Sequence, residues 1–257
     1  MTPSSPLFRL DGRVALVTGS SRGIGLAMAG ALADAGATIV LNGRDGDALT
    51  EAAAALAADG HTTHTERCDV TDEEAVSAMI DAIEADVGPL EILVNNAGVQ
   101  QRAPVLEFPV DDFRRVLAVN LVAPFAVAQA AARPMAERGR GKIINIGSVL
   151  SEFGRPTIVP YTTSKGGIRL LTRGLCADLG PLGIQVNTLA PGYFATDLTA
   201  DLVADETFST WVANRTPTGR WGRLDELAGP VVFLASDASG FVNGQTLYVD
   251  GGMTAVL

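Results

Sequence analysis

The sequence predicts one α/β domain in which a doubly wound, mostly parallel sheet carries helices on both faces. Three observations support this prediction. Short apolar runs alternate with helical stretches almost from end to end of the chain. These runs are apolar throughout, as is typical of parallel strands that are buried on both sides. The 257 residues contain no linker and no repeat of fixed period, so residues 1–257 suit a single large domain.

The first two strand–helix units follow directly from the pattern. RVALVT (13–18) is a short apolar run that predicts a buried strand. RGIGLAMAGALADAGA (22–37) predicts a helix that ends at Gly36. TIVLN (38–42) predicts the second strand, and the alanine-rich stretch 45–59 predicts the helix after it.

The middle of the chain continues the alternation. THTERCDV (63–70) predicts a third, weaker strand, and DEEAVSAMIDAIEADVG (72–88) predicts a third helix. LEILVNNAG (90–98) predicts a fourth strand that runs into a turn. A long helix is expected over 111–138.

The last third holds three more strands and one segment of a different kind. GKIINIGS (141–148) predicts the fifth strand, and a helix is expected over 160–180. GIQVNTLAPG (183–192) predicts the sixth strand and QTLYVDGG (245–252) the seventh. The stretch 193–223 is rich in Thr, Asp and Trp and has no strong periodicity. Long irregular segments are often functional, so we expect a lid there.

Composition narrows the possible partners and location. A net charge of −10 and a pI near 4.6 disfavour binding to nucleic acid or to an anionic membrane. The start, MTPSSPLFRLDGR, lacks the basic-then-apolar plan of a signal peptide. No apolar run approaches about 18 residues, so we expect a cytoplasmic protein without a membrane partner. Cys68 and Cys176 are too few for a disulfide framework or a metal cluster, and we expect two buried thiols and no metal site.

The turn VTGSSRGIG (17–25) indicates a phosphate-binding site. Gly19, Gly23 and Gly25 permit a tight turn, close approach of the backbone to a ligand, and packing of helix on strand. The turn follows the first strand and opens the first helix, whose unpaired N–H groups can bind a pyrophosphate. This strand–turn–helix context is what makes a glycine pattern informative.

The run YTTSK places Tyr161 and Lys165 four residues apart in the helix expected over 160–180. This spacing puts both side chains on one helix face, where the cation favours the phenolate and lowers the pKa of the phenol. Free tyrosine has a pKa of about 10, so such a shift would bring it toward the range useful for proton transfer. The same pair also occurs on ordinary protein surfaces, so it needs the context of the rest of the chain.

Five ordered motifs supply that context. The glycines are spaced TGxxxGxG, NNAG stands at 95–98, and PG stands at 191–192. Ser148 lies thirteen residues before the YxxxK pair, and Asn120 lies in the middle of the long helix. Together these motifs resemble the short-chain dehydrogenase/reductase family over the whole chain. The resemblance implies a Rossmann-type sheet of seven strands, a nicotinamide cofactor and commonly a homotetramer.

The same resemblance implies roles for the site residues. Tyr161 would be the general acid or base, and Lys165 would lower its pKa and hold the nicotinamide ribose. Ser148 would donate a hydrogen bond to the carbonyl oxygen, and Asn120 would hold a water that links Lys165 to solvent. The implied cofactor-binding residues are Gly19, Ser21, Arg22, Gly23, Ile24, Gly25, Asn42, Arg44, Asp69, Val70, Asn95, Ala97, Gly98, Tyr161, Lys165, Pro191, Gly192 and Thr196.

The residues after the second strand favour NADP(H), with NAD(H) use left open. An NAD site usually carries an acid there for the ribose hydroxyls, whereas NADP needs a cation for its phosphate. Here Asn42 and Gly43 stand where an acid would be expected, and Arg44 follows. Arg22 could approach from the glycine turn, and an arginine fork suits a phosphate. Asp45 could pair with Arg44 or cap the next helix.

Several stretches resemble one branch of the family, the gluconate 5-dehydrogenases (5-keto-D-gluconate reductases). They are TGSSRGIGLA, VLNGRD, NNAGVQQRAP, PGYFATDLT, WVANRTPTGRWG and FVNGQTLYVDGGMT. The match extends through the expected lid, and it implies reversible NADP(H)-linked oxidation of D-gluconate at C5. Asp197 in PGYFATDLT is a departure, because the branch usually has Glu there.

The candidate substrate residues are Arg102, Ser148, Ser151, Arg155 and Tyr161. A sugar acid needs a cation for its carboxylate, and Arg102 and Arg155 follow the fourth and fifth strands at the expected active-site edge. Both could equally be surface arginines. Ser151 and Glu152 could bind hydroxyls, although Glu152 could instead pair with Arg155.

Two other functions fit the same motifs. One is reduction of a different carbonyl substrate, such as a 3-oxoacyl-carrier-protein or a small ketone. An acidic carrier would need a basic docking patch, which the net charge of −10 disfavours. The other is an inactive, cofactor-sensing binding protein, which the presence of Asn120, Ser148, Tyr161 and Lys165 together argues against.

Overall fold

The computed structural model describes residues 5–196 and 199–256 and contains one parallel sheet of seven strands. The strands are β1 (Val14–Val17), β2 (Thr38–Gly43), β3 (Thr63–Arg67), β4 (Leu90–Asn95), β5 (Gly141–Ile146), β6 (Ile184–Pro191) and β7 (Thr246–Val249). Their order is β3-β2-β1-β4-β5-β6-β7, and every neighbouring pair is parallel. The order reverses beside β1, so the predicted doubly wound fold is confirmed, with a sheet that is parallel throughout.

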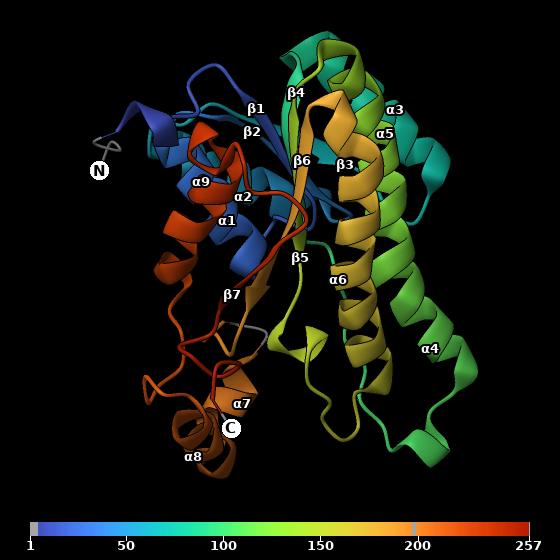
Figure 1. Ribbon diagram of the computed structural model, residues 1–257, viewed down its shortest axis with the longest axis vertical. Helices are drawn as coiled ribbons and strands as arrows, with labels where there is room; N and C mark the ends of the chain where they lie inside the picture. The colour runs from blue at the N-terminus through green and yellow to red at the C-terminus, as the bar shows by residue number, and fades with distance from the viewer. Residues whose placement is uncertain (1–4, 197–198, 257) are drawn as a thin grey trace.

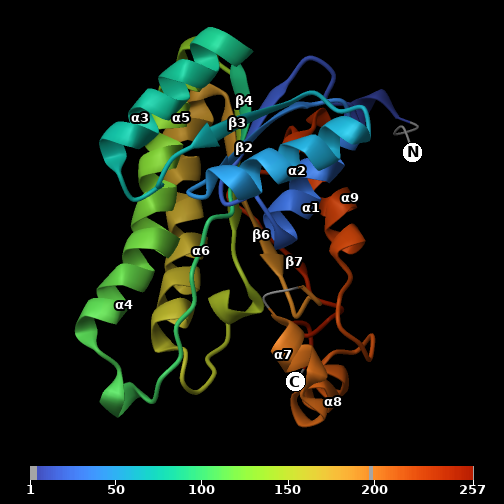
Figure 2. The same cartoon turned by 180° about the vertical axis from the view of Figure 1, so that it is seen from behind.

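Helices cover both faces of the sheet (Figure 1). Their bounds are α1 (Gly23–Asp34), α2 (Gly46–Ala58), α3 (Glu73–Ala82), α4 (Val110–Leu117), α5 (Ala123–Arg138), α6 (Val159–Leu179), α7 (Ala200–Ala204), α8 (Glu206–Arg215) and α9 (Ala228–Ala235). Helices α1, α2 and α9 pack on one face, and α3, α5 and α6 pack on the other, as the view from behind also shows (Figure 2). The strands between these two apolar layers are buried, except β3 and β7, which lie at the two edges of the sheet and are partly exposed.

The long helix predicted over 111–138 is interrupted by a π-helical segment, Ala118–Val122, between α4 and α5. The expectation that no apolar run is long enough to span a membrane was wrong for this stretch. Within the described residues Val110–Arg138 contains an 18-residue window of mean hydropathy 1.5. Its inner face packs on the sheet through residues such as Val127 and Ala131, so the apolar character follows from its place over the core.

The segment between β6 and β7 is more regular than the sequence pattern indicates. The expected lid, 193–223, contains α7 and α8, which lie beyond the carboxyl ends of the strands (Figure 1). Helix α9 was not predicted at all. Its sequence, AGPVVFLA, is apolar on all sides, so it lacks the helical periodicity on which the prediction relied.

Candidate active site

The glycine turn connects β1 to α1 at the carboxyl edge of the sheet. Gly19 and Gly23 both have positive φ, 61° and 59°, a conformation that only glycine adopts readily. A Cβ at Gly19 would lie 2.8 Å from the Cα of Ala97, and a Cβ at Gly25 would lie 2.5 Å from the Nδ2 of Asn96. A Cβ at Gly23 would meet nothing within 4 Å. Packing therefore requires glycine at 19 and 25, whereas the face of Gly23 is open to a ligand.

Two residues that the sequence analysis did not select hold this turn in place. The Thr18 hydroxyl accepts the backbone N–H groups of Asn96 (3.0 Å) and Ala97 (3.1 Å). The Asn96 amide donates to the carbonyls of Thr18 (2.8 Å) and Gly19 (2.9 Å). The NNAG motif is thus tied to the glycine turn across the sheet. Both residues lie inside recognised motifs, but only the fold shows that they bind each other.

The space around the turn suits a dinucleotide. A cavity of about 460 Å³ lies between the glycine turn and the start of the lid, lined by Gly23, Ala195, Thr196 and Leu224 among others. The N-cap residue of α1, Arg22, makes no side-chain capping bond, so the first N–H groups of α1 lack a side-chain acceptor there. Together with the open face of Gly23, these groups could hold a pyrophosphate. Ser21 and Ile24 lie in the same turn and first helical residues.

Two polar residues near the expected adenosine end of the site, Asn42 and Asp45, form hydrogen bonds within the protein. Asn42 is buried, and its amide donates to the carbonyls of Glu66 (3.1 Å) and Cys68 (3.2 Å), so it joins β2 to β3 and does not present its side chain to a ribose. Asp45 accepts the N–H groups of Asp47 and Ala48 and is the N-cap of α2, which resolves its two possible roles. The amide of Asn42 and the Oδ1 of Asp45 are therefore engaged within the protein.

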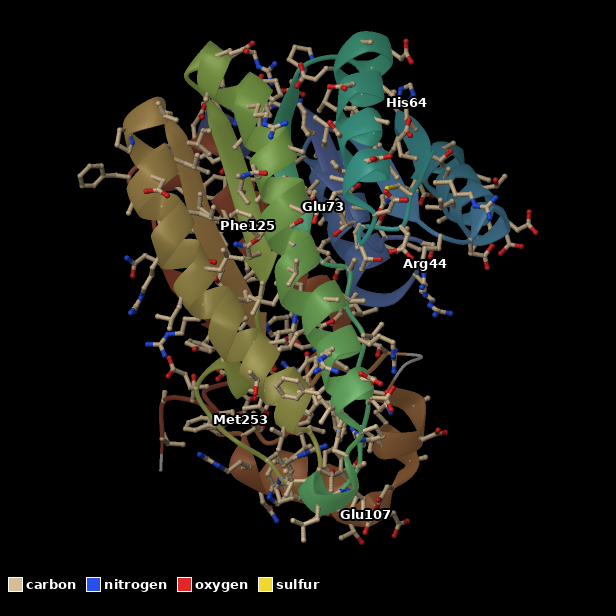
Figure 3. The ribbon with its side chains drawn as sticks, turned by 90° about the vertical axis from the view of Figure 1, so that its right-hand side faces the viewer. Arg44, His64, Glu73, Glu107, Phe125 and Met253 are labelled. Atoms are coloured by element: carbon tan, nitrogen blue, oxygen red, sulfur yellow. The ribbon has the colours of Figure 1, made fainter. Side chains whose placement is uncertain are left out.

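Arg44 is the cation at this end of the site. Its side chain is 74% exposed and points away from the sheet (Figure 3), with Nη1 3.7 Å from Asp69. Two hydrogen bonds from Thr71 and the nearby Arg44 guanidinium hold the pKa of Asp69 below its usual range. Val70, beside Asp69, is buried. Arg44 therefore remains available to a phosphate at modest cost, because an exposed ion pair at this distance is weak.

Other residues expected at the cofactor make contacts within the protein itself. The Asn95 amide donates to Pro124 O and to Asn145 Oδ1, each at 3.0 Å, so its side chain points into the interior. Gly192 follows Pro191 at the end of β6, and a Cβ there would lie 2.8 Å from the Cα of Asp250. Thr196 forms a local turn with Thr199. Ala97 and Gly98 border the turn and the Asn120 side chain respectively.

Ser148, Tyr161 and Lys165 converge at the carboxyl end of β5. Lys165 is buried, and its Nζ donates to the carbonyl of Ile146 (2.7 Å) and lies 5.5 Å from the centroid of the Tyr161 ring. Ser148 accepts the N–H of Leu150 (3.2 Å), which orients its hydroxyl. The structure therefore brings together the three residues that the YxxxK spacing and the preceding serine indicated.

The expected cause of the tyrosine pKa shift is not the one the structure displays. Burial raises the pKa of Tyr161, a hydrogen bond with Ser148 lowers it, and the neighbouring Tyr193 raises it again. Burial also lowers the pKa of Lys165 to about 8. Lys165 is not among the groups that shift the pKa of Tyr161 here, since its amine donates to Ile146, and the lowering of the tyrosine pKa by Lys165 stays a prediction.

Asn120 sits in the π-helical segment and is fully buried. Its Oδ1 accepts the N–H of Val99 (2.8 Å), and its Nδ2 donates to the Val99 carbonyl (2.8 Å) and to Ser164 Oγ (3.2 Å). The side chain is therefore committed to the loop after β4. A proton relay at this residue would have to use its backbone carbonyl, and π-helical segments do occur often at functional sites.

The two candidate arginines lie on adjacent loops at the mouth of the site. The N–H of Ala103 donates to the carbonyl of Thr157 (3.0 Å), which joins the loop of Arg102 to that of Arg155. Burial lowers the pKa of Arg102, and the like charge of Arg155 lowers it further. Thr157 has φ of 69°, unusual for a β-branched residue and typical of strained backbone at functional sites.

Two weaker substrate candidates have other roles. Ser151 is buried and accepts the backbone N–H of Ser148 (3.2 Å), so its hydroxyl fixes the backbone at Ser148. Glu152 binds Arg169 (2.8 Å) and accepts from the Tyr248 hydroxyl (3.0 Å), so it does not pair with Arg155. Asp197, the departure noted in the lid, lies outside the described residues.

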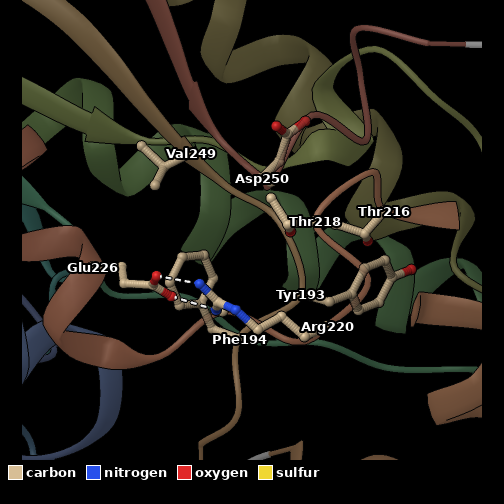
Figure 4. A pocket seen from close by; sticks show the side chains of 10 residues that line it. Tyr193, Phe194, Thr216, Thr218, Arg220, Glu226, Val249 and Asp250 are labelled. Carbon is tan, nitrogen blue, oxygen red and sulfur yellow. Dashed lines mark hydrogen bonds and ion pairs between the residues drawn. The ribbon is translucent and has the colours of Figure 1, made fainter. Parts of the chain in front are cut away.

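A second, smaller cavity lies between residues of the lid and the end of β7 (Figure 4). It has a volume of about 120 Å³, and Tyr193, Thr216, Thr218 and Asp250 are among the residues that line it. Arg220 and Glu226 form an ion pair at its edge, 2.6 Å between Nη2 and Oε1. Ser148, Tyr161 and Lys165 do not line this cavity, so it is separate from the reacting groups.

The glycine turn and the buried Ser148–Tyr161–Lys165 group are the two halves of a nicotinamide-dependent oxidoreductase, and the chain belongs to the short-chain dehydrogenase/reductase family. Residues 19–254 match the family model adh_short_C2, described as enoyl-(acyl carrier protein) reductase. The chain is 54% identical over 251 residues to gluconate 5-dehydrogenase of Gluconobacter oxydans (strain 621H), covering 98% of both.

Two further relatives agree with this assignment. The chain is 48% identical over 247 residues to 5-keto-D-gluconate 5-reductase of Escherichia coli (strain K12), covering 96% of this chain and 97% of the relative. The crystal structure of a gluconate 5-dehydrogenase from Burkholderia cenocepacia J2315 in complex with NADP and tartrate is 55% identical, with a TM-score of 0.95 and 98% coverage of both chains. The chain is similar to each of these along essentially its whole length.

Proposed function

We propose that this chain catalyses the reversible, NADP(H)-linked interconversion of D-gluconate and 5-keto-D-gluconate. The observation that carries the proposal is that Arg102 and Arg155 stand on two loops joined by the hydrogen bond between Ala103 and Thr157, beside the Ser148, Tyr161 and Lys165 group. Within residues 5–196 and 199–256 neither forms an ion pair with a carboxylate of the protein, so both can bind an anionic substrate. Full-length similarity to enzymes named for this reaction supports the same substrate.

The roles of the residues follow from their positions. A bound nicotinamide supplies or accepts the hydride. In the reducing direction Tyr161 gives its phenolic proton to the carbonyl oxygen, and in the oxidising direction it takes that proton back. Ser148 donates a hydrogen bond to the same oxygen as negative charge develops on it. Lys165, fixed by Ile146 beneath the tyrosine ring, holds a positive charge close to the phenol and to the expected position of the ribose.

The direct test is consumption of NADPH with 5-keto-D-gluconate, followed by absorbance. We expect turnover by the wild type and a loss of at least about 10²-fold in kcat for Tyr161→Phe, because the proton donor is removed. Tyr248→Phe is the matched control, since Tyr248 binds Glu152 outside the reacting group, and it should retain near-normal kcat. Turnover of an acetoacetyl thioester with none of 5-keto-D-gluconate would refute this substrate and favour an acyl reductase.

The preference for NADP(H) is the second part of the proposal. Arg44 is exposed beyond β2, Arg22 precedes α1, and the nearby acid Asp45 is used as a helix cap. We expect Arg44→Ala to raise the KM for NADPH by about tenfold while leaving the KM for NADH within twofold, since only NADPH carries the 2′-phosphate. Arg9→Ala is the control, because Arg9 pairs with Asp11 near the start of the chain. It should change neither the KM for NADPH nor the KM for NADH. Equal changes for both cofactors would show that Arg44 does not read the phosphate.

The assembly and location belong to the same proposal. We infer a cytoplasmic homotetramer, in keeping with the family, whose contacts include the outer face of α4, α5 and α6. Large apolar side chains are exposed there, including Val110 (62%), Val122 (53%), Phe125 (43%) and Leu170 (64%), and Figure 3 looks onto this face. Apolar surface of this extent on packed helices is typical of a protein–protein contact.

A further inference from the structure

Arg155 is held by the lid and, among the residues that the structure describes, by no carboxylate. Its Nη1 donates to the hydroxyl of Tyr193 (3.2 Å), and its guanidinium carbon lies 5.1 Å from the centroid of the Phe208 ring. Tyr193 is the second residue after β6, and Phe208 belongs to α8. Arg155 itself stands on the loop between β5 and α6. The contact therefore joins the substrate side of the site to the lid.

The hydroxyl of Tyr193 is fixed in place by three aromatic rings. Phe208, Trp211 and Trp221 lie at centroid distances of 5.6, 5.7 and 5.7 Å from its ring, all in edge-to-face geometry. Trp221 is itself anchored by a hydrogen bond from its Nε1 to Ser209 Oγ (3.1 Å). Edge-to-face pairs contribute beyond simple burial, so this cluster restrains rotation of the tyrosine ring. Because the Tyr193 hydroxyl is fixed, its hydrogen bond restricts the flexible side chain of Arg155 to one geometry.

The hydrogen-bonding capacity of Arg155 leaves room for a ligand. A guanidinium carries five N–H donors and accepts none, and one donor is used by Tyr193. The remaining donors are enough for a bidentate contact with a carboxylate. Without the Tyr193 hydroxyl and the Phe208 ring, the like charge of Arg102 would tend to drive Arg155 away from the site.

We propose that Tyr193 and Phe208 are positioning residues that hold Arg155 beside Arg102. The carboxylate of the substrate is then bound only when these two lid residues contact Arg155. The inference rests on the proposed function, because it assumes that the two arginines bind the carboxylate. It adds that the lid selects for a negatively charged substrate through the arginine it holds, rather than by direct contact with the polyol. Neutral ketones have no carboxylate, so the position of Arg155 should not change how tightly they bind.

The decisive variant is Tyr193→Phe, which removes the acceptor and keeps the ring. For 5-keto-D-gluconate we expect KM to rise about tenfold with kcat within twofold, because hydrogen bonds to charged groups are among the stronger ones. Turnover of a neutral ketose of the same length should be unchanged relative to wild type. The dissociation constant of NADPH, followed by tryptophan fluorescence, should also stay the same. Tyr248→Phe is again the matched control.

A double-mutant cycle separates positioning from direct binding. If Tyr193 acts through Arg155, Tyr193→Phe should have no further effect in an Arg155→Met background. Phe208→Leu should likewise weaken anion binding only when Arg155 is present. Tartrate binding to the enzyme–NADP complex, measured by calorimetry, provides the same cycle without any turnover. Additive effects in the cycle would overturn the proposal, as would an unchanged KM and tartrate affinity in Tyr193→Phe.

The two proposals fail in different ways. If the wild type does not reduce 5-keto-D-gluconate but binds tartrate in a manner that depends jointly on Tyr193 and Arg155, the substrate is wrong and the lid-held anion site stands. If the wild type reduces 5-keto-D-gluconate and Tyr193→Phe behaves as wild type, the substrate stands and the positioning role is wrong. A wild type that binds neither anion would show that there is no anion site to position.

Discussion

The chain has only two lysines, Lys142 and Lys165, and both are buried on or beside β5. Lys165 donates to Ile146 at the carboxyl end of that strand. Lys142 lies at the opposite end, and its Nζ donates to Ser239 Oγ (3.1 Å). All other permanent cations are arginines, which are more easily accommodated in ion pairs because the guanidinium is weakly hydrated. Each lysine therefore occupies a place where a compact amine is held by a specific acceptor.

Lys142 gives a stability prediction with a definite sign. Burial lowers its pKa to about 8, and nearby Asp237 opposes that shift. In the unfolded chain a lysine has a pKa of about 10.4, so between these values the unfolded state binds more protons and the free energy of unfolding rises with pH. The contribution is up to about 3 kcal/mol over that range.

The measurement is urea unfolding of wild type and Lys142→Met from pH 7 to pH 10.5. Methionine has an uncharged, unbranched side chain close to lysine in length, and Ser239 keeps its own bonds to Leu234 and Ser236. We expect the variant to be the more stable protein at pH 7 and to lose about 3 kcal/mol of that advantage by the upper limit. A difference that stays constant with pH would mean that Lys142 has the same pKa in the folded and the unfolded chain, so that burial does not lower it.

At the scale of elements, the predicted strands and the first helices match the structure because their signal is local. An apolar run between turn residues needs no partner to be recognised, and the seven predicted strands all exist. The π-helical segment at Asn120 could not be predicted in the same way. The helical pattern continues through it, and its geometry accompanies hydrogen bonds to Val99, which lies in another part of the chain.

In the candidate site, too, residues with a local sequence signal could be predicted, and residues whose partners are set by the fold could not. Ser148, Tyr161 and Lys165 are recognisable because their spacing in the sequence is the spacing that brings them together on one strand end and one helix. Asn42, Ser151 and Glu152 were candidates for binding a ligand, yet each forms hydrogen bonds within the protein itself. Their partners include residues 24, 3 and 17 positions away, and residue type alone does not reveal whether a polar side chain is already satisfied.

At the scale of the whole molecule, the outer face of α4, α5 and α6 gives the last prediction. Phe125 on α5 and Leu170 on α6 are 43% and 64% exposed on helices that pack against each other. If this face is a contact between subunits, Phe125→Glu with Leu170→Glu should place carboxylates in an apolar interface, where an unpaired charge is strongly unfavourable. We expect sedimentation equilibrium to give a tetramer for the wild type and a dimer for the double variant.

Leu182→Glu, which changes a 45% exposed leucine beyond the end of α6, is the control and should remain a tetramer. Because each site lies within one chain, the dimer should still bind NADPH, so loss of cofactor affinity would point to misfolding rather than dissociation. A double variant that sediments as the wild type does would exclude this face from the assembly.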